Sequence, residues 1–146
     1  MAFWGAPVDC DDHEERAVTC AGLMLVALEK LNEEIEAEGL PKLGIGIGIN
    51  TGPCVIGNMG GEKRFDYSAI GDAVNVAARL ESSTRKYTED VLIGETTAKA
   101  VQPFLVQPLD SIEVKGKSER LSVYTLSEDA IRDAHLSNYW DREINP

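Results

Sequence analysis

The sequence lacks the features of a membrane-spanning or exported chain. None of its apolar runs approaches the ~20 residues that a helix needs to cross a bilayer. Its first residues do not combine a charged stretch with a following apolar one, so they do not resemble a signal peptide. We therefore expect a soluble, cytoplasmic chain that makes no membrane contact of its own. A membrane anchor upstream in a parent protein stays open.

Positive charge and paired cysteines are also scarce. The 14 Lys and Arg residues face 25 Asp and Glu residues, which gives a net charge of −11. Nucleic-acid backbones need a basic face, so we expect no nucleic-acid partner. Cys10, Cys20 and Cys54 are odd in number and lack C-x-x-C spacing, which argues against a disulfide framework or a zinc site. We interpret each as a small buried apolar side chain in a reducing compartment.

The composition suits one domain with a real core, since 43% of the 146 residues are hydrophobic. The clearest predicted element is a helix within residues 9–39, with Asp11 or Asp12 as its cap and Gly39 as its stop. Its apolar residues follow the helical period and predict one buried face. These residues are Ala17, Ala21, Met24, Leu28, Leu31 and Ile35.

Isoleucine and glycine alternate strictly over residues 44–49 (GIGIGI), which predicts a strand. One face of that strand is all isoleucine and the other has no side chains, so a helix or another backbone can approach it closely. Residues 50–53 (NTGP) predict a turn, and 54–57 (CVIG) predict the returning strand of a hairpin. The glycines lie inside the strand, so they do not form a dinucleotide-binding fingerprint.

The remaining predicted elements are shorter. They are a strand-like run at 1–4, a loop at 58–66, a helix at 71–86, a strand at 91–94, a helix at 96–101, two strands within 104–126 around a turn at 115–119, and a loosely held polar tail at 128–146. Helices mixed with hairpin strands on a short chain predict an α+β fold. We expect an antiparallel sheet with helices on one face.

One polar pair stands out in the otherwise small and apolar run of residues 73–80, within the helix predicted at 71–86. Asn75 and Arg79 are four residues apart and therefore share one helix face. An arginine presented in this way suits a phosphate, a carboxylate or a developing oxyanion. The alternative is structural: Arg79 pairs with an acid such as Glu81 or Asp72, and Asn75 merely caps a turn.

Four sequence blocks change the balance between these readings. MAFWGAP, GIGINTGPCVIGNMG, EKRFDYSAIGDAVNVAARLE and VKGKSERLSVYTL occur in this order and resemble the catalytic domain of the class III nucleotidyl cyclases, the adenylate and guanylate cyclases. The resemblance covers residues 1–127 and leaves 128–146 as the tail. It implies a ferredoxin-like, antiparallel-rich fold without its first strand and helices. It also implies head-to-tail homodimers with shared active sites.

The resemblance implies a reaction in which the ribose 3′-hydroxyl of ATP attacks the α-phosphate, giving cyclic AMP and pyrophosphate. Asn75 would hold the ribose, and Arg79 would meet the charge that grows on the α-phosphate. Ser68 stands where family members read the purine. Adenylate cyclases usually carry Asp or Thr there and guanylate cyclases Cys, so Ser68 resembles the threonine-bearing bacterial branch. The alternative is a plain hydroxyl on the approach to the helix.

Basic residues would supply the phosphate contacts. Lys115 matches the lysine that grips the polyphosphate in the family, with Lys117 as the second choice. Lys63 or Arg64 is a further candidate for a phosphate contact, made from the opposing subunit.

The family's two Mg²⁺ or Mn²⁺ ions bind two aspartates that would precede the first residue of this chain. Nothing here replaces them convincingly, because the cluster of Asp9, Asp11 and Asp12 follows the first strand, at the start of a helix. We read Asp66 and Asp72 as structural. We therefore assign no metal ligand to this chain and expect little or no activity from it alone.

The leading hypothesis is the C-terminal portion of an adenylate cyclase catalytic domain, which serves cyclic-nucleotide biosynthesis in intracellular signalling. One alternative is a pseudocyclase module that dimerises and regulates without catalysis, and another is a guanylate cyclase. A third is an α+β scaffold with an accidental match. Whether the first residue is the true start stays open.

Overall fold

The structure is a computed structural model that describes residues 1–61, 64–113 and 120–136. In chain order its elements are α1 (His13–Ala37), β1 (Ile47–Ile49), β2 (Val55–Gly61), β3 (Arg64–Ile70), α2 (Asp72–Ser83), η1 (Thr84–Lys86), β4 (Val91–Gly94), α3 (Glu95–Ala100), η2 (Pro103–Leu105), β5 (Val106–Glu113), β6 (Arg120–Leu126) and α4 (Glu128–Leu136). Within this described part, no helix combines the length and apolar character needed to cross a membrane.

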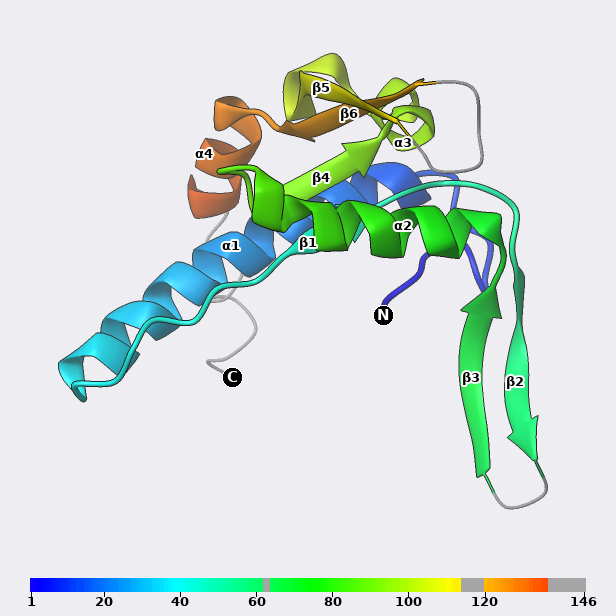
Figure 1. Ribbon diagram of the computed structural model, residues 1–146, viewed down its shortest axis with the longest axis horizontal. Coiled ribbons are helices and arrows are strands. Elements are labelled where there is room, and N and C mark those ends of the chain that lie inside the picture. Colours follow the sequence, from blue (N-terminus) through cyan, green and yellow to red (C-terminus); the bar gives the residue numbers. More distant parts are fainter. Residues whose placement is uncertain (62–63, 114–119, 137–146) are drawn as a thin grey trace.

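The strands form two separate sheets. The main sheet has the order β1-β4-β6-β5, in which β1 and β4 are parallel and the other neighbours are antiparallel. Among the described residues, strands β2 and β3 pair only with each other. Figure 1 shows this pair, which we call the β2–β3 arm (residues 55–61 and 64–70), projecting away from the main sheet and the helices. The chain therefore consists of a packed body and a protruding arm.

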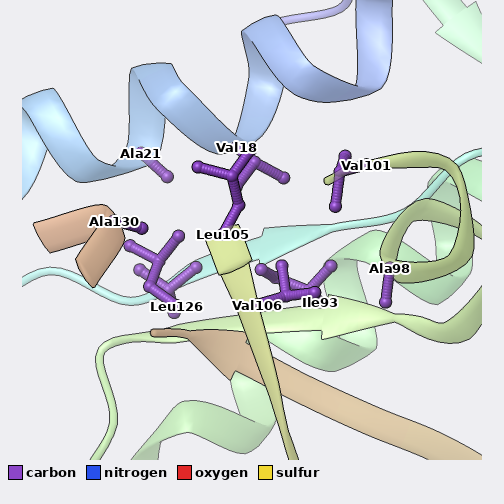
Figure 2. Packing of buried hydrophobic residues seen from close by; sticks show 10 residues of the cluster. Val18, Ala21, Ile93, Ala98, Val101, Leu105, Val106, Leu126 and Ala130 are labelled. Atoms are coloured by element: carbon purple, nitrogen blue, oxygen red, sulfur yellow. The ribbon is translucent and has the colours of Figure 1, made fainter. Parts of the chain in front are cut away.

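Strand β4 lies at the centre of the packing, because all four of its residues are buried. Val91 and Ile93 face a cluster that includes residues from α1, α3 and α4 (Figure 2). The buried members of that cluster are Val18, Ala21, Val91, Ile93, Ala98, Val101, Leu105, Val106, Leu126 and Ala130. Leu92 points the other way and packs with Leu80 of α2 and Val123 of β6. Both faces of the sheet are therefore covered.

The predicted mixture of helices and an antiparallel-rich sheet is confirmed. Helices cover both faces of the sheet, however, and not one face as predicted. Consecutive apolar residues in the strand at 91–94 put a large side chain on each face, and each face needs its own cover. The α2 helix covers one face, and α1, α3 and α4 cover the other.

The ends of α1 lie where the sequence predicts them. Asp12 occupies the N-cap position, but its side chain makes no capping hydrogen bond. At the other end Gly39 adopts a φ of +75°, a left-handed conformation that glycine tolerates without strain. The Gly39 N–H donates to Glu36 O at 2.9 Å, and the Leu40 N–H donates to Ile35 O at 3.1 Å. These bonds satisfy terminal carbonyls in the manner of a Schellman motif.

The predicted buried face of α1 is only half right. The buried residues of the helix are Ala17, Val18, Ala21, Gly22 and Val26. By contrast, Met24 and Leu31 are 45% and 44% exposed. The face that meets the sheet is centred on Val18 and Ala21. The second half of the helix extends past the sheet in Figure 1, so its apolar residues have less to pack against.

The cysteines are free, but they are not all buried. Cys54 is exposed, which makes the buried interpretation wrong at that position, while Cys10 and Cys20 are half-buried. The Cys10 thiol donates to Asp12 Oδ1 at 3.0 Å, and Arg16 Nε donates to the same oxygen at 2.7 Å. These two bonds lower the pKa of Asp12, and the bond from the thiol has the larger effect. The same bond to Asp12 raises the pKa of Cys10.

Two local predictions in the first half of the chain are wrong. Residues 1–12 contain no strand. The segment at 54–57 does not pair with the strand at 44–49, because β1 pairs in parallel with β4 and β2 pairs with β3. The register runs from Val55 opposite Ile70 to Gly61 opposite Arg64, so most of the predicted loop at 58–66 is strand. The glycines in this segment favoured the loop prediction, but an exposed two-stranded ribbon tolerates them.

The structure also differs from the predicted tail over residues 128–136, which form α4. Ser127 caps this helix, because its Oγ accepts from the Ala130 N–H at 3.0 Å. The helix packs on α1: a Cβ placed at Gly22 would lie 3.3 Å from the Cβ of Ala134. Residues 137–146 lie outside the described part of the chain.

Candidate active site

The α2 helix, which carries the Asn75 and Arg79 pair, packs on the glycine face at β1, formed by Gly48 of the strand and Gly46 just before it. A Cβ at Gly48 would collide with the backbone oxygen of Ala77 and the backbone nitrogen of Glu81, and one at Gly46 would collide with a side chain of η1. The prediction that a bare strand face admits a close helix is confirmed. Backbone atoms define this contact, so the helix has little room to shift.

The start of α2 is fixed by three short contacts. Asn50 follows β1, and its Nδ2 donates to the carbonyl of Ala73 at 3.1 Å. Gly71, the single residue between β3 and α2, is the N-cap. A Cβ at Gly71 would lie 3.0 Å from Pro53 O and 3.1 Å from the Cα of Cys54. The junction between the arm and the helix is therefore closely packed.

The other end of α2 is anchored through buried and hydrogen-bonded side chains. Leu80 is 0% exposed, and the Thr84 hydroxyl donates to Glu81 O at 2.7 Å. Beyond η1, the Tyr87 hydroxyl donates to Asp110 Oδ2 on β5 at 2.8 Å. Burial, and then the bond to Asp110, raise the pKa of Tyr87. Both ends of the helix are thus tied to the main sheet.

The opposite face of α2 is open to solvent. Its exposed residues are Asp72, Asn75, Ala78, Arg79 and Ser82. The side chains of Asn75 and Arg79 make no hydrogen bond or ion pair with any residue in the described ranges, whereas Glu81 pairs with Arg85 at 3.8 Å. The alternative in which Arg79 pairs with Glu81 is therefore wrong. An amide and a guanidinium lie on one exposed face, held by a rigidly packed backbone.

Ser68 lies on the arm, close in sequence to the helix. It is a half-buried residue of β3 that pairs in register with Gly57. Alternation along the strand puts Ser68 on the same face as Asp66 and Ile70, which are exposed. Only Gly71 separates the strand of Ser68 from the helix of Asn75, so the geometry of that junction sets their relative positions.

Of the predicted phosphate-binding residues, Arg64 alone lies within the described part of the chain. Lys63, Lys115 and Lys117 lie outside the described residues. Arg64 begins β3, where its backbone pairs with Gly61. The strands predicted on either side of the turn at 115–119 are confirmed as β5 and β6. The roles of these four basic residues stay predictions.

The acids of the described residues do not form a metal centre. Within 1–61, 64–113 and 120–136, no group of three or more His, Cys, Asp or Glu side chains could hold one ion. In the Asp9, Asp11 and Asp12 cluster, Asp12 is already bonded to Cys10 and Arg16. These donors do not fit the two-metal centre that the family resemblance implies.

Sequence reasoning missed Asn50 and Thr51, which it treated only as part of a turn. Thr51 Oγ1 lies 2.9 Å from Thr97 Oγ1 of α3, while Asn50 contacts α2. One signal could have revealed them, because polar side chains directly after a buried strand often meet neighbouring elements at the strand's carboxyl end.

A family model described as the adenylate and guanylate cyclase catalytic domain matches residues 1–128. The chain belongs to this family. The resemblance stated from the four sequence blocks is therefore confirmed, and the open face of α2 is the natural candidate for the active site of this cyclase domain.

Curated relatives support the same family. Adenylate cyclase 1 of Rhizobium meliloti (strain 1021) is 39% identical over 125 residues, which are 85% of this chain and 19% of the relative. The adenylate cyclase of Anabaena cylindrica is 39% identical over 122 residues, 78% of this chain and 24% of the relative. The cyclase domain thus spans about a fifth to a quarter of the length of these two relatives.

Solved structures confirm the cyclase fold. The adenylyl cyclase CyaB from P. aeruginosa has a TM-score of 0.75 and 32% identity over 86% of this chain and 65% of that chain. The guanylyl cyclase Cya2 has a TM-score of 0.72 and 34% identity over 84% of this chain and 61% of that chain. Both purine specificities therefore occur among similar structures.

Proposed function

We propose that this chain is the C-terminal portion of an adenylate cyclase catalytic domain, which converts ATP into cyclic AMP and pyrophosphate for intracellular signalling. The observation that carries the proposal is the exposed pair of Asn75 and Arg79 on a helix whose backbone is packed on a bare strand face. Membership of the cyclase family, with adenylate cyclases at 39% identity, supports it.

The reaction makes two demands that this pair can meet. The ribose 3′-oxygen must lie in line with the bond from the α-phosphorus to the leaving pyrophosphate, and the charge that grows on the α-phosphate oxygens must be stabilised. The Asn75 amide holds the ribose in that orientation. The Arg79 guanidinium donates to the α-phosphate oxygens as the new bond forms. The close packing of α2 supports catalysis because donors that are already oriented need no reorganisation.

Ser68 contacts the purine in this proposal. Its hydroxyl can accept from the exocyclic amino group of adenine or donate to a ring nitrogen. Guanine offers a carbonyl at the same position, to which a hydroxyl can also donate, so guanylate cyclase is the second candidate. The similarity to the guanylyl cyclase Cya2 supports this second candidate.

The polyphosphate and the metals involve groups beyond the described residues. We assign Lys115 to the polyphosphate, and Lys63 or Arg64 to a phosphate contact from the opposing subunit. The acids described here do not fit a metal centre, so we assign the family's two Mg²⁺ or Mn²⁺ ions to carboxylates that this chain does not carry.

A homodimer with shared active sites is part of the proposal, and the β2–β3 arm supports it. Val55 and Ile70, which pair at the base of the arm, are 68% and 58% exposed. Tyr67, 50% exposed, packs on Phe3 with ring centroids 5.8 Å apart. A two-stranded ribbon is marginally stable in isolation, and an exposed apolar surface of this kind suits a second copy of the domain.

The test is a cyclase assay with Mn²⁺ and ATP, in which cyclic AMP is detected by chromatography. The chain is compared with a longer chain in which the preceding part of a relative's catalytic domain, such as that of CyaB, is joined upstream. Arg79→Ala is made in both forms. Arg85→Ala is the matched control, because Arg85 is an exposed arginine that pairs with Glu81.

We expect only the longer chain to turn over, and we expect Arg79→Ala to lower its kcat by about 10²–10³-fold, as for loss of one transition-state donor. Arg85→Ala should leave turnover almost unchanged. Activity in the short chain would overturn the metal assignment. A folded longer chain that binds ATP but makes no cyclic AMP, with GTP tested in parallel, would favour the regulatory pseudocyclase module.

A further inference from the structure

We propose that Asn50 is a positioning residue for the reaction. Its amide fixes the first turn of α2 and thereby sets the orientation of Asn75 and Arg79. This inference rests on the proposed function. Asn50 does not belong to the exposed face that would meet the nucleotide. It lies between β1 and α2 and is half-buried.

The argument begins with the place of Asn50 in the sheet. Strands β1 and β4 are parallel, and Ile49 pairs in register with Ile93. Asn50 and Gly94 therefore follow at the same carboxyl edge. A Cβ at Gly94 would collide with Oδ1 of Asn50. The missing side chain at Gly94 leaves the space that the Asn50 amide occupies.

From this position the amide reaches the helix. Asn50 Nδ2 donates to Ala73 O at 3.1 Å, two residues before Asn75. The same carbonyl belongs to the first turn, where the regular α-helical pattern gives it the Ala77 N–H as well. A side-chain donor on this carbonyl resists rotation of α2 about its axis. Since Asn75 and Arg79 share one face, such a rotation would displace both side chains together.

A second bond holds the turn that carries Asn50. Thr51 Oγ1 and Thr97 Oγ1 are 2.9 Å apart, and Thr97 is 0% exposed. A Cβ at Gly52 would lie 2.9 Å from the Cβ of Ala73, so the chain after Thr51 also passes close to the helix. The turn is therefore fixed on α3 and packed against α2.

Asn32 provides a matched control elsewhere in the molecule. Its Nδ2 donates to Leu43 O at 2.9 Å, and its Oδ1 accepts from the Leu43 N–H at 2.8 Å. Asn32 therefore also ties a loop to a helix through side-chain-to-backbone bonds, but it acts on α1 and not on α2. Loss of either asparagine removes similar bonding, and only the loss of Asn50 should affect the site.

The experiment compares Asn50→Asp, Asn50→Ala and Asn32→Ala in two forms. In the chain itself, amide hydrogen exchange is measured over residues 73–79. In the longer chain of the cyclase assay, kcat and KM are measured for each variant with and without Arg79→Ala. Asn50→Asp is nearly isosteric but replaces the donor to Ala73 O with an oxygen.

We expect Asn50→Asp and Asn50→Ala to lower kcat roughly tenfold with a smaller change in KM, and to speed exchange over residues 73–79. In the Arg79→Ala background the kcat effect should become clearly smaller, because only Asn75 then depends on the position of the helix. Asn32→Ala should change neither quantity. A kcat loss of the same size with and without Arg79, or equal exchange in the Asn50 and Asn32 variants, would overturn the positioning role.

Failure of the proposed function gives a different pattern. If the unaltered longer chain makes no cyclic nucleotide, the reaction assignment is wrong. Amide exchange alone then tests whether Asn50 holds α2 in place. Faster exchange over residues 73–79 in Asn50→Asp than in Asn32→Ala would still support the hold of Asn50 on α2, and equal exchange would refute it.

Discussion

The α2 helix and the β2–β3 arm are adjacent in sequence but are held in opposite ways. The helix contacts the glycine face of β1 through its backbone and is tied to the main sheet by Asn50 at one end and Tyr87 at the other. The arm makes its strand pairing only within itself in the described part of the chain. It leaves Val55 and Ile70 largely exposed.

Both regions contribute to the same proposed site. Asn75 and Arg79, which would act on the ribose and the α-phosphate, lie on the helix, whereas Ser68, which would contact the purine, lies on the arm. The core of the chain therefore fixes the residues that we propose act on the reacting atoms. The placement of the purine contact depends on whatever covers the arm, which we propose is a second copy of the domain.

The largest effect should come from filling the glycine face of β1. Gly48→Val would place a side chain against the backbone of Ala77 and Glu81, which cannot move without displacing α2. We expect the free energy of unfolding to fall by about 3 kcal/mol or more, if the variant folds at all. Urea denaturation followed by far-UV circular dichroism measures this loss.

Gly57→Val is the control for that substitution, because a Cβ at Gly57 meets nothing within 4 Å. Valine suits a strand, so this variant in the arm should stay within about 1 kcal/mol of the unaltered chain. Equal destabilisation by the two substitutions would show that the helix and the arm are not held differently.

An effect that leaves folding intact and is confined to association should follow from charging the arm. The Val55→Lys, Ile70→Lys double variant changes two exposed side chains, so the stability of the isolated chain should change little. Burial of these side chains in a dimer is worth about 3 kcal/mol or more, so the dissociation constant should rise at least ~100-fold. Analytical ultracentrifugation of the longer chain measures it. Val8→Lys, at a 77% exposed position outside the arm, is the control, and equal effects would exclude the arm as the interface.

The smallest effect should come from the second anchor of α2. Tyr87→Phe removes the 2.8 Å bond to Asp110 and should lower the free energy of unfolding by about 1 kcal/mol near neutral pH. Because the pKa of Tyr87 is raised in the folded chain, the unfolded chain loses this proton first. The contribution is present below about pH 10 and is lost as the pH rises through the folded-state pKa.

Thermal melts between pH 7 and 11 check this expectation. The unaltered chain should lose stability more steeply in alkali than Tyr87→Phe does. Tyr67→Phe, in the exposed arm, should follow the unaltered chain. Parallel curves for all three proteins would show that the bond to Asp110 does not help to hold the end of the helix.

Local patterns in the sequence were enough to predict the helix and its packing. The alternation in residues 44–49 predicted a face without side chains, and Gly48 indeed lies against α2. The spacing of Asn75 and Arg79 predicted a shared face, and both are exposed there. Such inferences succeed because they need only the period of a strand or a helix.

Pairings between distant segments could not be predicted in this way. The partner of β1 is β4, which follows the arm and α2 in sequence, and not the adjacent segment at 54–57. The buried face of α1 depends on where that helix crosses the sheet, which its own periodicity does not contain. Asn50 looked like an ordinary turn residue because its partners, Ala73 and Gly94, lie far along the chain.

The glycines that admit α2 have a further consequence for how the domain opens. Glycine loses more backbone entropy on ordering than any other residue, so an alternating strand of only three residues has little order of its own. Strand β1 is ordered by the helix that covers it, and the helix is placed by the strand. The two should open as one cooperative unit. A fluctuation that exposes the edge of the sheet would then also disrupt the proposed catalytic face, and neither could be lost without the other.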